Sequence, residues 1–399
     1  MNIFFKCENY QRIGAFKARG AFHALSRLSD AELERGVVTH SVRRRRPQSQ
    51  SRRRAEYDTN DELPQSGNHA QALALAAKTR QIPAHIIMPT ISTPSKIAST
   101  RSQGATIYFS GSTAPEREKV LKEVQADTGA VFVPPYDHPD IILGQGTLAL
   151  EFETQVKEMC RERKEGDEAR EGYGWRFRAA RSAQQEAETK PSQNSNGTTT
   201  NGTTVHHPSE GLDAVIAPCG GGGMLSGVAT ALHTTGIHVF GSEPSFEGAD
   251  DARRSLASDP PTLITSVSTL TIADGLRTPL GKIPWSIISD PAKVRGIYAV
   301  TEDQIKSAMR LIYERMKVVV EPSAAVPLAV CLFDEGFRRL VEREGGEEGW
   351  NVGVVLSGGN TTMEAVAKLF AEEKQEVGGE RAEGKIGLDG ERKAENVAG

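Results

Sequence analysis

The chain has 399 residues, 38% of them hydrophobic and 25% charged, enough to bury a core in two lobes around a cleft. Lys and Arg number 48 against 52 Asp and Glu, so the net charge of −4 excludes a general electrostatic attraction to nucleic acid or anionic membranes. There is no apolar run of about 20 residues and no signal-peptide pattern, so we expect a cytoplasmic protein whose partner is a small molecule. The four cysteines lack Cys-x-x-Cys spacing and are expected to be reduced thiols.

Short apolar runs alternate with longer helical patterns along the chain. The runs are Ala84 to Met88, Thr106 to Phe109, Ala214 to Ala217, Val239 to Gly241 and Val352 to Leu356. This alternation predicts an α/β fold with parallel sheets flanked by helices. In such folds ligands bind where a strand turns into a helix, as we predict between Thr39 and Gly67 and between Pro218 and Gly227.

Lys17 is the first candidate site residue, in the segment Gly-Ala-Phe-Lys-Ala-Arg-Gly that begins at Gly14. A lysine at the start of a helix can attack a carbonyl if a desolvating pocket or a nearby cation lowers the pKa of its amine. Taken alone, the segment favours an amphipathic helix with an exposed lysine.

A basic segment, Val42 to Gln65, interrupts the sequence between Thr39-His40-Ser41 and Ser66-Gly67. Its seven arginines fit a nuclear-localisation or nucleic-acid patch, or a solvated loop. We favour a third interpretation, because Val codons begin with GT and one Gln codon is CAG, as at the ends of a retained in-frame intron. Deleting the segment restores Thr-His-Ser-Ser-Gly-Asn-His.

The sequence Ser66-Gly67-Asn68-His69 precedes a helical run to Lys78. Backbone N–H groups at a helix start carry partial positive charge, so a carboxylate could bind here. An ordinary N-cap explains the same residues equally well.

Two later stretches do not fit a packed domain. The first, about Arg161 to Glu210, is charged and then rich in Ser, Asn, Gly and Thr, so it cannot bury enough apolar surface to offset its ordering entropy. We expect a disordered surface insertion there and a disordered, solvated tail from Glu372 to Gly399.

Four successive glycines, Gly220 to Gly223, follow the apolar run that ends at Ala217 and precede Met224. Such a loop lets several N–H groups point at one anion, and the dipole of the next helix adds to the attraction. The segment lacks the Lys-Ser/Thr of a nucleotide P-loop, so we predict a cradle for a smaller phosphate ester. A flexible glycine hinge is the alternative.

Ser357 lies in the sequence Leu-Ser-Gly-Gly-Asn that ends at Asn360, directly after the last apolar run. By position, this turn could bring a hydroxyl to the floor of the cleft. A simple strand-to-helix turn explains the segment as well.

Together and in this order, these elements resemble the fold type II pyridoxal-phosphate (PLP) enzymes, from Phe4 to about Phe370. Within them the chain resembles the branch of serine racemase, serine/threonine dehydratase and threo-3-hydroxyaspartate ammonia-lyase. The resemblance implies a homodimer and two domains of parallel sheets flanked by helices. The large domain would comprise 1–36 and 151–371, without a further strand and helix that precede the lysine motif in the family, and the small domain would comprise 37–150.

The resemblance also implies roles for individual residues. Lys17 would form a Schiff base with the cofactor and act as a catalytic base, and Ser66 would deliver a proton on the opposite face of the substrate. The cofactor-binding residues would be Phe16, Lys17, Asn68, Gly220, Gly221, Gly222, Gly223, Met224 and Ser357, and the substrate-binding residues Ser41, Ser66, Asn68 and His69. Ser357 would hydrogen-bond the pyridine nitrogen.

An acidic segment, Ser242 to Asp251, resembles the divalent-cation site of the racemase branch. Glu243, the carbonyl of Ala249 and Asp251 would supply oxygen ligands for Mg²⁺, Mn²⁺ or Ca²⁺. A solvated acidic loop is the alternative interpretation.

The resemblance implies racemisation of L-serine or a related hydroxy amino acid, or its β-elimination to a keto acid and ammonia. Because a loose arginine-rich loop would separate Ser41 from Ser66, we expect low activity of the chain as written. The alternatives are a threo-3-hydroxyaspartate ammonia-lyase, a catalytically impaired PLP-binding remnant of a mis-spliced gene, and an arginine-loop adaptor that contacts nucleic acid.

Overall fold

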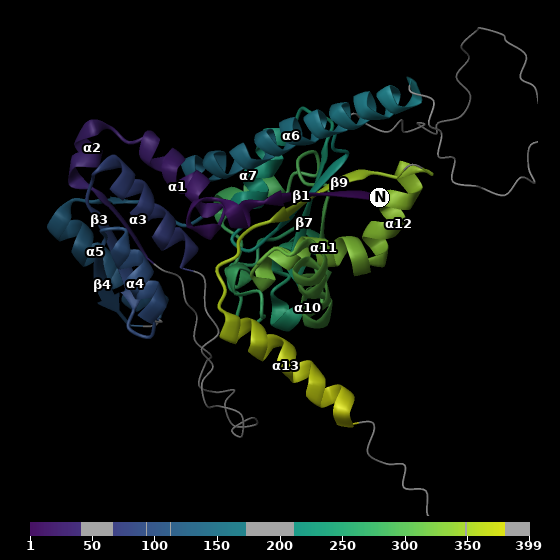
Figure 1. The fold of residues 1–399 in the computed structure, drawn as a ribbon. Coiled ribbons are helices and arrows are strands. Elements are labelled where there is room, and N and C mark those ends of the chain that lie inside the picture. Colours follow the sequence, from purple (N-terminus) through teal and green to yellow (C-terminus); the bar gives the residue numbers. More distant parts are fainter. Residues whose placement is uncertain (41–66, 93, 112, 173–210, 348, 380–399) are drawn as a thin grey trace, which may run out of the picture.

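A computed structural model describes residues 1–40, 67–92, 94–111, 113–172, 211–347 and 349–379 of the chain (Figure 1). The predicted insert, Val42 to Gln65, lies outside the described residues. So do Ser41 and Ser66, two of the predicted substrate-binding residues.

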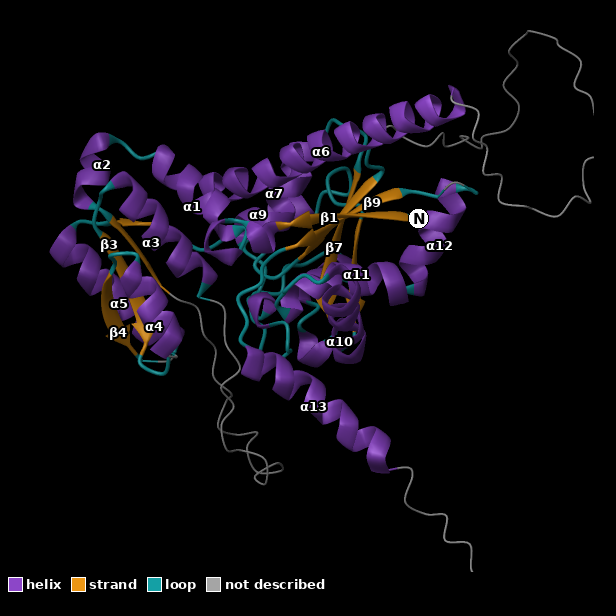
Figure 2. Ribbon diagram, viewed as in Figure 1, coloured by secondary structure: helices purple, strands orange, loops and turns teal. Residues whose placement is uncertain are grey.

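Two parallel sheets organise the described residues (Figure 2). Five strands have the order β1-β9-β6-β7-β8, and four have the order β4-β3-β2-β5. The strands are β1 Asn2–Cys7, β2 Val37–His40, β3 Ala84–Pro89, β4 Thr106–Ser110, β5 Val131–Phe132, β6 Ala214–Pro218, β7 His238–Pro244, β8 Gly296–Val300 and β9 Asn351–Leu356. Each of the five predicted apolar runs is part of a strand, and the predicted parallel α/β architecture is confirmed.

Helices connect and cover the strands. They are α1 Lys17–Ser26, α2 Asp30–Arg35, α3 Asn68–Arg80, α4 Pro94–Ser102, α5 Ala114–Thr128, α6 Pro139–Gly172, α7 Gly223–Leu232, α8 Asp251–Ala257, α9 Lys282–Ile288, α10 Glu302–Leu311, α11 Pro322–Phe333, α12 Glu335–Gly345 and α13 Met363–Gly379. In Figure 1, α6 runs from the side of the four-stranded sheet across the five-stranded sheet, and α13 extends away from the body of the protein.

The five-stranded sheet is buried on both faces, as its continuous apolar runs require. One face packs against α10, α11 and α12, around side chains such as Phe240, Phe337 and Trp350. The other face packs against α6, α7 and α9, where Val215 and Leu225 are buried. The four-stranded sheet is covered by α1 and α3 on one face and by α5 on the other.

A buried ion pair fixes α1, the helix that begins with Lys17, to the end of β1. Both oxygens of Glu8 accept hydrogen bonds from the guanidinium of Arg19, at 2.7 and 2.8 Å. Arg19 also donates to Glu151 of α6 at 3.0 Å. The Glu8 side chain is 3% exposed and that of Arg19 10%, so water screens their attraction only weakly.

Two expectations of disorder are wrong in part. α6 continues to Gly172, into the stretch predicted to be disordered from about Arg161, and α13 continues to Gly379, beyond Glu372. The α6 extension consists largely of Glu, Lys and Arg, and the α13 extension begins with Glu, Lys and Gln, all residues of high helix propensity; extending a helix also costs less than starting one. The remainder of both stretches, 173–210 and 380–399, lies outside the described residues.

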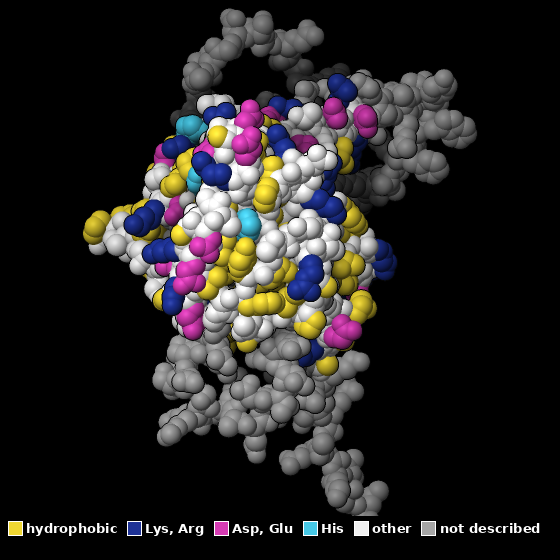
Figure 3. Space-filling view, turned by 90° about the vertical axis from the view of Figure 1, so that its left-hand side faces the viewer, with side chains coloured by type: hydrophobic (Ala, Val, Ile, Leu, Met, Phe, Trp, Pro, Cys, Tyr) yellow, Lys and Arg dark blue, Asp and Glu magenta, His cyan; other side chains and the backbone are white. Residues whose placement is uncertain are grey.

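The surface viewed from the side of the four-stranded sheet carries interspersed acidic and basic side chains, with hydrophobic side chains gathered near its centre (Figure 3). Among the described residues, none of the helices combines the length and the apolar character needed to cross a bilayer.

The Glu8–Arg19 pair yields a stability prediction. Glu8→Gln removes the buried one of the two carboxylates that pair with Arg19, and we expect the free energy of unfolding to fall by about 3 kcal/mol, as measured by urea denaturation. Glu335→Gln is the matched control, because Glu335 pairs with Arg339 at a surface where both side chains are at least 75% exposed. Equal, small losses in the two variants would show that the buried pair contributes no special stability.

Candidate active site

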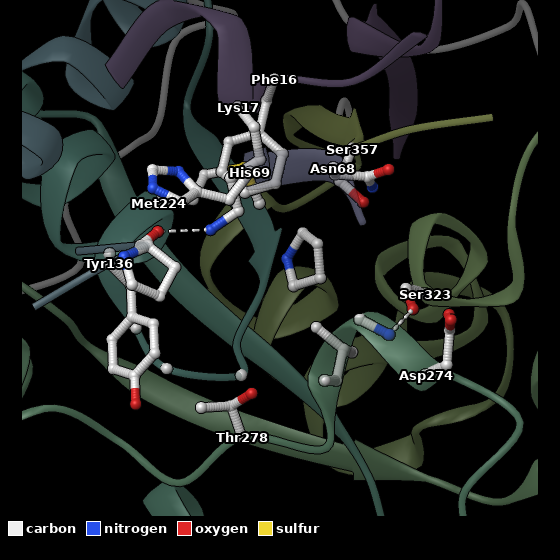
Figure 4. Close-up of a pocket in the computed structure, with 18 of the residues that line it drawn as sticks. Phe16, Lys17, Asn68, His69, Tyr136, Met224, Asp274, Thr278, Ser323 and Ser357 are labelled. Atoms are coloured by element: carbon white, nitrogen blue, oxygen red, sulfur yellow. Dashed lines mark hydrogen bonds between the residues drawn. The ribbon is translucent and has the colours of Figure 1, made fainter. Parts of the chain in front are cut away.

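A solvent-connected cavity lies where the carboxyl ends of β2, β6 and β9 approach one another (Figure 4). In parallel sheets this is where strands turn into helices and polar groups converge. Its lining includes Phe16, Lys17, His40, Gly67, Asn68, His69, Pro135, Tyr136, Gly220, Gly221, Gly222, Gly223, Met224, Asp274, Thr278, Glu321, Ser323 and Ser357.

Lys17 is the first residue of α1, and its amine points into the cavity (Figure 4). The amine donates a hydrogen bond of 2.7 Å to the carbonyl of Pro135 and lies 5.0 Å from the centre of the Phe16 ring. Desolvation lowers the pKa of Lys17 to about 8, although the negative charge of Glu321 opposes this shift. A sizeable fraction of the amine is therefore neutral, and nucleophilic, near neutral pH.

The glycine loop, Gly220 to Gly223, joins β6 to the first turn of α7. A Cβ atom at Gly220 would lie 2.9 Å from the Cα of Leu276, and one at Gly221 would lie 2.5 Å from the ring of Tyr136. Gly222 also has a φ of +84°, which favours glycine. The loop therefore lines the cavity with backbone rather than side chains, at the positive end of α7.

Asn68, the first residue of α3, is held at both ends of its side-chain amide. Its oxygen accepts a 2.8 Å hydrogen bond from Asn360, and its nitrogen lies 3.4 Å from each carboxylate oxygen of Glu321. Asn68 and Glu321 are 5% and 4% exposed. Asn68 thus lies between Asn360 and Glu321 at the cavity wall, with its amide nitrogen on the side of Glu321.

Two histidines line the cavity beside Lys17. Burial and the Lys17 charge lower the pKa of His69 to about 3, while burial and Arg117 lower that of His40 to about 4. The His69 Nε2 lies 3.0 Å from the carbonyl of Val133, which can only accept, so this nitrogen carries the hydrogen. Both rings are therefore neutral near pH 7 and bring no charge to the cavity.

Ser357, directly after β9, is 3% exposed and lines the cavity close to Asn68 (Figure 4). Its carbonyl accepts the N–H of Phe16 at 3.1 Å, and Ala15 forms a β-bridge with Gly358. The serine turn and the segment that carries Lys17 are therefore joined through their backbones.

The structure brings together every described residue of the predicted cofactor and substrate sites. Phe16, Lys17, Asn68, His69, the four loop glycines, Met224 and Ser357 all line the one cavity, whereas Ser41 and Ser66 lie outside the described residues. The sequence interpretation missed Pro135, Tyr136, Asp274, Glu321 and Ser323. A signal existed for Glu321, because Glu-Pro-Ser breaks an apolar run just before the helix that starts at Pro322.

The predicted metal ligands lie next to the glycine loop. Cys219, the residue before the loop, donates its N–H to the carbonyl of Ser242, the residue before Glu243. The Glu243 carboxylate is fully buried and accepts the N–H groups of Ala252 and Arg253, at 3.0 and 2.9 Å. Burial and the nearby Asp251 carboxylate raise the pKa of Glu243 well above its ordinary value.

Asp251, at the start of α8, is 1% exposed and accepts the N–H of Leu280 at 3.0 Å. Burial raises its pKa to about 6. In the parts of the chain that the structure describes, no three His, Cys, Asp or Glu side chains gather as a metal site. The predicted set therefore rests on two carboxylates and the buried Ala249, whose contribution would be a backbone carbonyl.

Comparison with known proteins agrees with this geometry. The family model "Pyridoxal-phosphate dependent enzyme" matches residues 63–162 and 177–358. A serine racemase of Oryza sativa subsp. indica is 34% identical over 363 residues, which cover 90% of this chain and 81% of the relative. The L-threo-3-hydroxyaspartate ammonia-lyase of Saccharomyces cerevisiae is 33% identical over 372 residues, 92% of this chain and 86% of the relative.

Among solved structures, maize serine racemase superposes with a TM-score of 0.67 at 33% identity, and the match covers 94% of this chain and 88% of the maize chain. The resemblance to fold type II PLP enzymes is thereby confirmed. The lysine, the glycine loop and the serine turn converge on one cavity, as the resemblance implied. Because the family model also matches most of the length of the chain, the chain belongs to the pyridoxal-phosphate dependent enzyme family.

Proposed function

We propose that this protein uses PLP to racemise L-serine or a related hydroxy amino acid, or to eliminate its β-hydroxyl and yield a keto acid and ammonia. The observation that carries the proposal is the desolvated amine of Lys17, which shares one cavity with the glycine loop at the start of α7. The identity to serine racemase and 3-hydroxyaspartate ammonia-lyase over about nine-tenths of the chain supports the choice of substrate class.

The cavity fits the cofactor group by group. The amides of Gly220 to Gly223 would hold the phosphate, the Asn68 amide nitrogen would donate to the ring oxygen, and the Ser357 hydroxyl would face the pyridine nitrogen. Phe16 would pack beside the ring. When bound, PLP supplies an electron sink for negative charge that develops at the substrate Cα.

Lys17 would act as the base that removes the Cα proton. With a pKa near 8, the amine is basic enough to accept that proton and yet partly neutral at physiological pH. Its present hydrogen bond to Pro135 would hold it in the cavity until it reacts.

The substrate carboxylate would bind at the start of α3, where Gly67 and Asn68 line the cavity. Because His69 is neutral and donates its one N–H to the Val133 carbonyl, it would line this site without charge and offer only an acceptor, Nδ1. Return of a proton from the opposite face, which we assign to Ser66, would invert the centre, whereas loss of the hydroxyl would give elimination. Ser41 would join Ser66 in holding the substrate.

The 3-hydroxyaspartate ammonia-lyase activity is the second candidate, favoured by the yeast relative. It uses the same Lys17 base and differs in the second carboxylate of the substrate. Comparing kcat/KM for L-serine and L-threo-3-hydroxyaspartate on the purified protein would decide between the two.

We further propose that Glu243, the Ala249 carbonyl and Asp251 hold a divalent cation, with Mg²⁺, Mn²⁺ or Ca²⁺ as candidates. Two buried carboxylates placed close together repel each other, and a cation between them would remove that cost. The site would then brace the strand next to the glycine loop.

We also propose a cytoplasmic homodimer. The four cysteines are free thiols in the structure, which supports a reducing compartment, and the dimer follows the family resemblance. Sedimentation velocity of the purified protein would measure its oligomeric state. The five-stranded sheet would form the centre of a large domain (1–36 and 151–371) and the four-stranded sheet that of a small domain (37–150).

The central test is attachment of the cofactor to Lys17. Treatment of the PLP-loaded protein with sodium borohydride should leave one pyridoxyl group on the Lys17 peptide, detected by mass spectrometry. Lys17→Ala should lose this label and lower turnover of L-serine by at least about 10³-fold, because it removes the attacking amine and the base together. Lys78→Ala, at an exposed helix position, is the control. A pyridoxyl group found on another residue of the Lys17→Ala variant would contradict the proposal.

The cation proposal predicts a change in thermal stability. Chelation with EDTA should lower the Tm by about 5 °C, and excess Mg²⁺ or Mn²⁺ should restore it by mass action. Asp251→Asn should make the Tm insensitive to both treatments, while Asp303→Asn, at a side chain that is 91% exposed, should respond as the wild type does. A Tm that is unchanged by chelation would refute the site.

The segment Val42 to Gln65 yields a separate prediction. β2 ends at His40 and α3 starts at Asn68, and both residues line the cavity, so we expect removal of the segment to tighten this edge of the site. The shortened protein should turn over L-serine at least about tenfold faster than the full chain. Equal turnover would refute this expectation, and binding of PLP without turnover in both proteins would favour the catalytically impaired remnant.

A further inference from the structure

Asn360 lies outside the cavity lining described above, yet it belongs to one segment that forms the site and contacts two others. It follows β9 in the turn that begins with Ser357, and its side-chain nitrogen donates two hydrogen bonds of 2.8 Å. One goes to the carbonyl of Ile13, just before the lysine helix, and the other to the side-chain oxygen of Asn68 at the start of α3.

The Ile13 carbonyl decides which way the amide of Asn360 points. A backbone carbonyl can only accept hydrogen bonds, so the group that faces it must be the Asn360 nitrogen and not its oxygen. The second hydrogen of the same nitrogen then meets the Asn68 side chain. Only the oxygen of Asn68 can accept it, which turns the Asn68 nitrogen the other way, toward Glu321 and the cavity.

The surrounding backbone keeps Asn360 in this place. Gly14 has a φ of +70°, and a Cβ atom there would lie 2.8 Å from the Asn360 side-chain oxygen. The carbonyl of Gly14 accepts the N–H of Gly359 at 3.0 Å, which ties the two turns together. The Asn360 amide therefore lies close to Gly14, where a larger residue would collide with it.

We propose that Asn360 is a positioning residue, which acts through Asn68 and does not itself touch the cofactor. It keeps a hydrogen-bond donor, and not an acceptor, directed from Asn68 into the cavity at the place proposed for the cofactor ring oxygen. This inference rests on the proposed function, because a PLP oxyanion is stabilised by a donor and repelled by an acceptor.

Asn360→Asp is the sharpest variant, because it keeps the shape of the side chain but removes both donors. Asn68 would then have a carboxylate on each side of its amide, so its oxygen would be repelled in either orientation and its nitrogen would no longer be held toward the cavity. We expect the Kd for PLP, measured by fluorescence titration, to rise about 100-fold, and the absorption band of the bound cofactor to shift. Asn360→Ala frees Asn68 without adding this repulsion, so its Kd should rise about tenfold.

A double-mutant cycle separates positioning from general loosening of the structure. In an Asn68→Ala background, Asn360→Ala should change the Kd for PLP less than twofold, since the group that it orients is gone. Asn9→Ala is the matched control, because Asn9 donates to the carbonyl of Val319 beside the same turn and this hydrogen bond does not involve Asn68. It should preserve the wild-type Kd and absorption band.

Three results would overturn the inference. These are a wild-type Kd and band in Asn360→Asp, an undiminished effect of Asn360→Ala in the Asn68→Ala background, or an Asn9→Ala variant as impaired as Asn360→Ala. If Asn360→Asp does not fold, as judged from its Tm without cofactor, Asn360→Ala and the cycle still decide. Failure of the wild type to bind PLP at all would instead overturn the proposed function, and the inference with it.

Discussion

Desolvation of the Lys17 amine is the physical constraint on which the proposed chemistry depends. In water a lysine is protonated almost completely at neutral pH, and its positive charge prevents it from acting as a nucleophile or a base. Desolvation in the cavity disfavours the charged form and lowers the pKa of the amine, while the negative charge of Glu321 limits how far the pKa falls. The opposing effects leave the amine near pKa 8, where the protonated and neutral forms are both accessible.

The rest of the architecture brings fixed groups to this amine. α1 presents Lys17 and is fastened by the buried pair of Glu8 and Arg19, so the lysine sits on a rigid element. The carboxyl ends of strands from both parallel sheets then supply amides and hydroxyl groups around it. Because these groups belong to segments far apart in the chain, correct folding of both sheets is needed to assemble the site.

The sequence was informative where a local pattern has a local cause. Apolar runs predicted the strands, and a run of glycines after β6 predicted a tight turn into a helix, because both depend on neighbouring residues. The pairing of Asn2 with Asn351 has no local signal, and neither does the contact of the Pro135 carbonyl with Lys17. The helical ends of α6 and α13 were missed because low hydrophobicity was given more weight than helix propensity.

The four loop glycines are subject to two constraints, the proposed binding of an anion and close packing against neighbouring residues. Inspection of the sequence alone does not separate these two constraints. A methyl group at any of the four glycines would lie within 3.0 Å of a neighbouring residue. The neighbour is Leu276 for the first glycine, Tyr136 for the second and fourth, and Leu280 for the third. The four glycines would therefore resist replacement even in a descendant of this protein that had ceased to bind any anion. Retention of the four glycines in such a lineage would report the shape of the interior, and loss of the partner aromatic at Tyr136 would be the earlier sign that selection on the loop had relaxed.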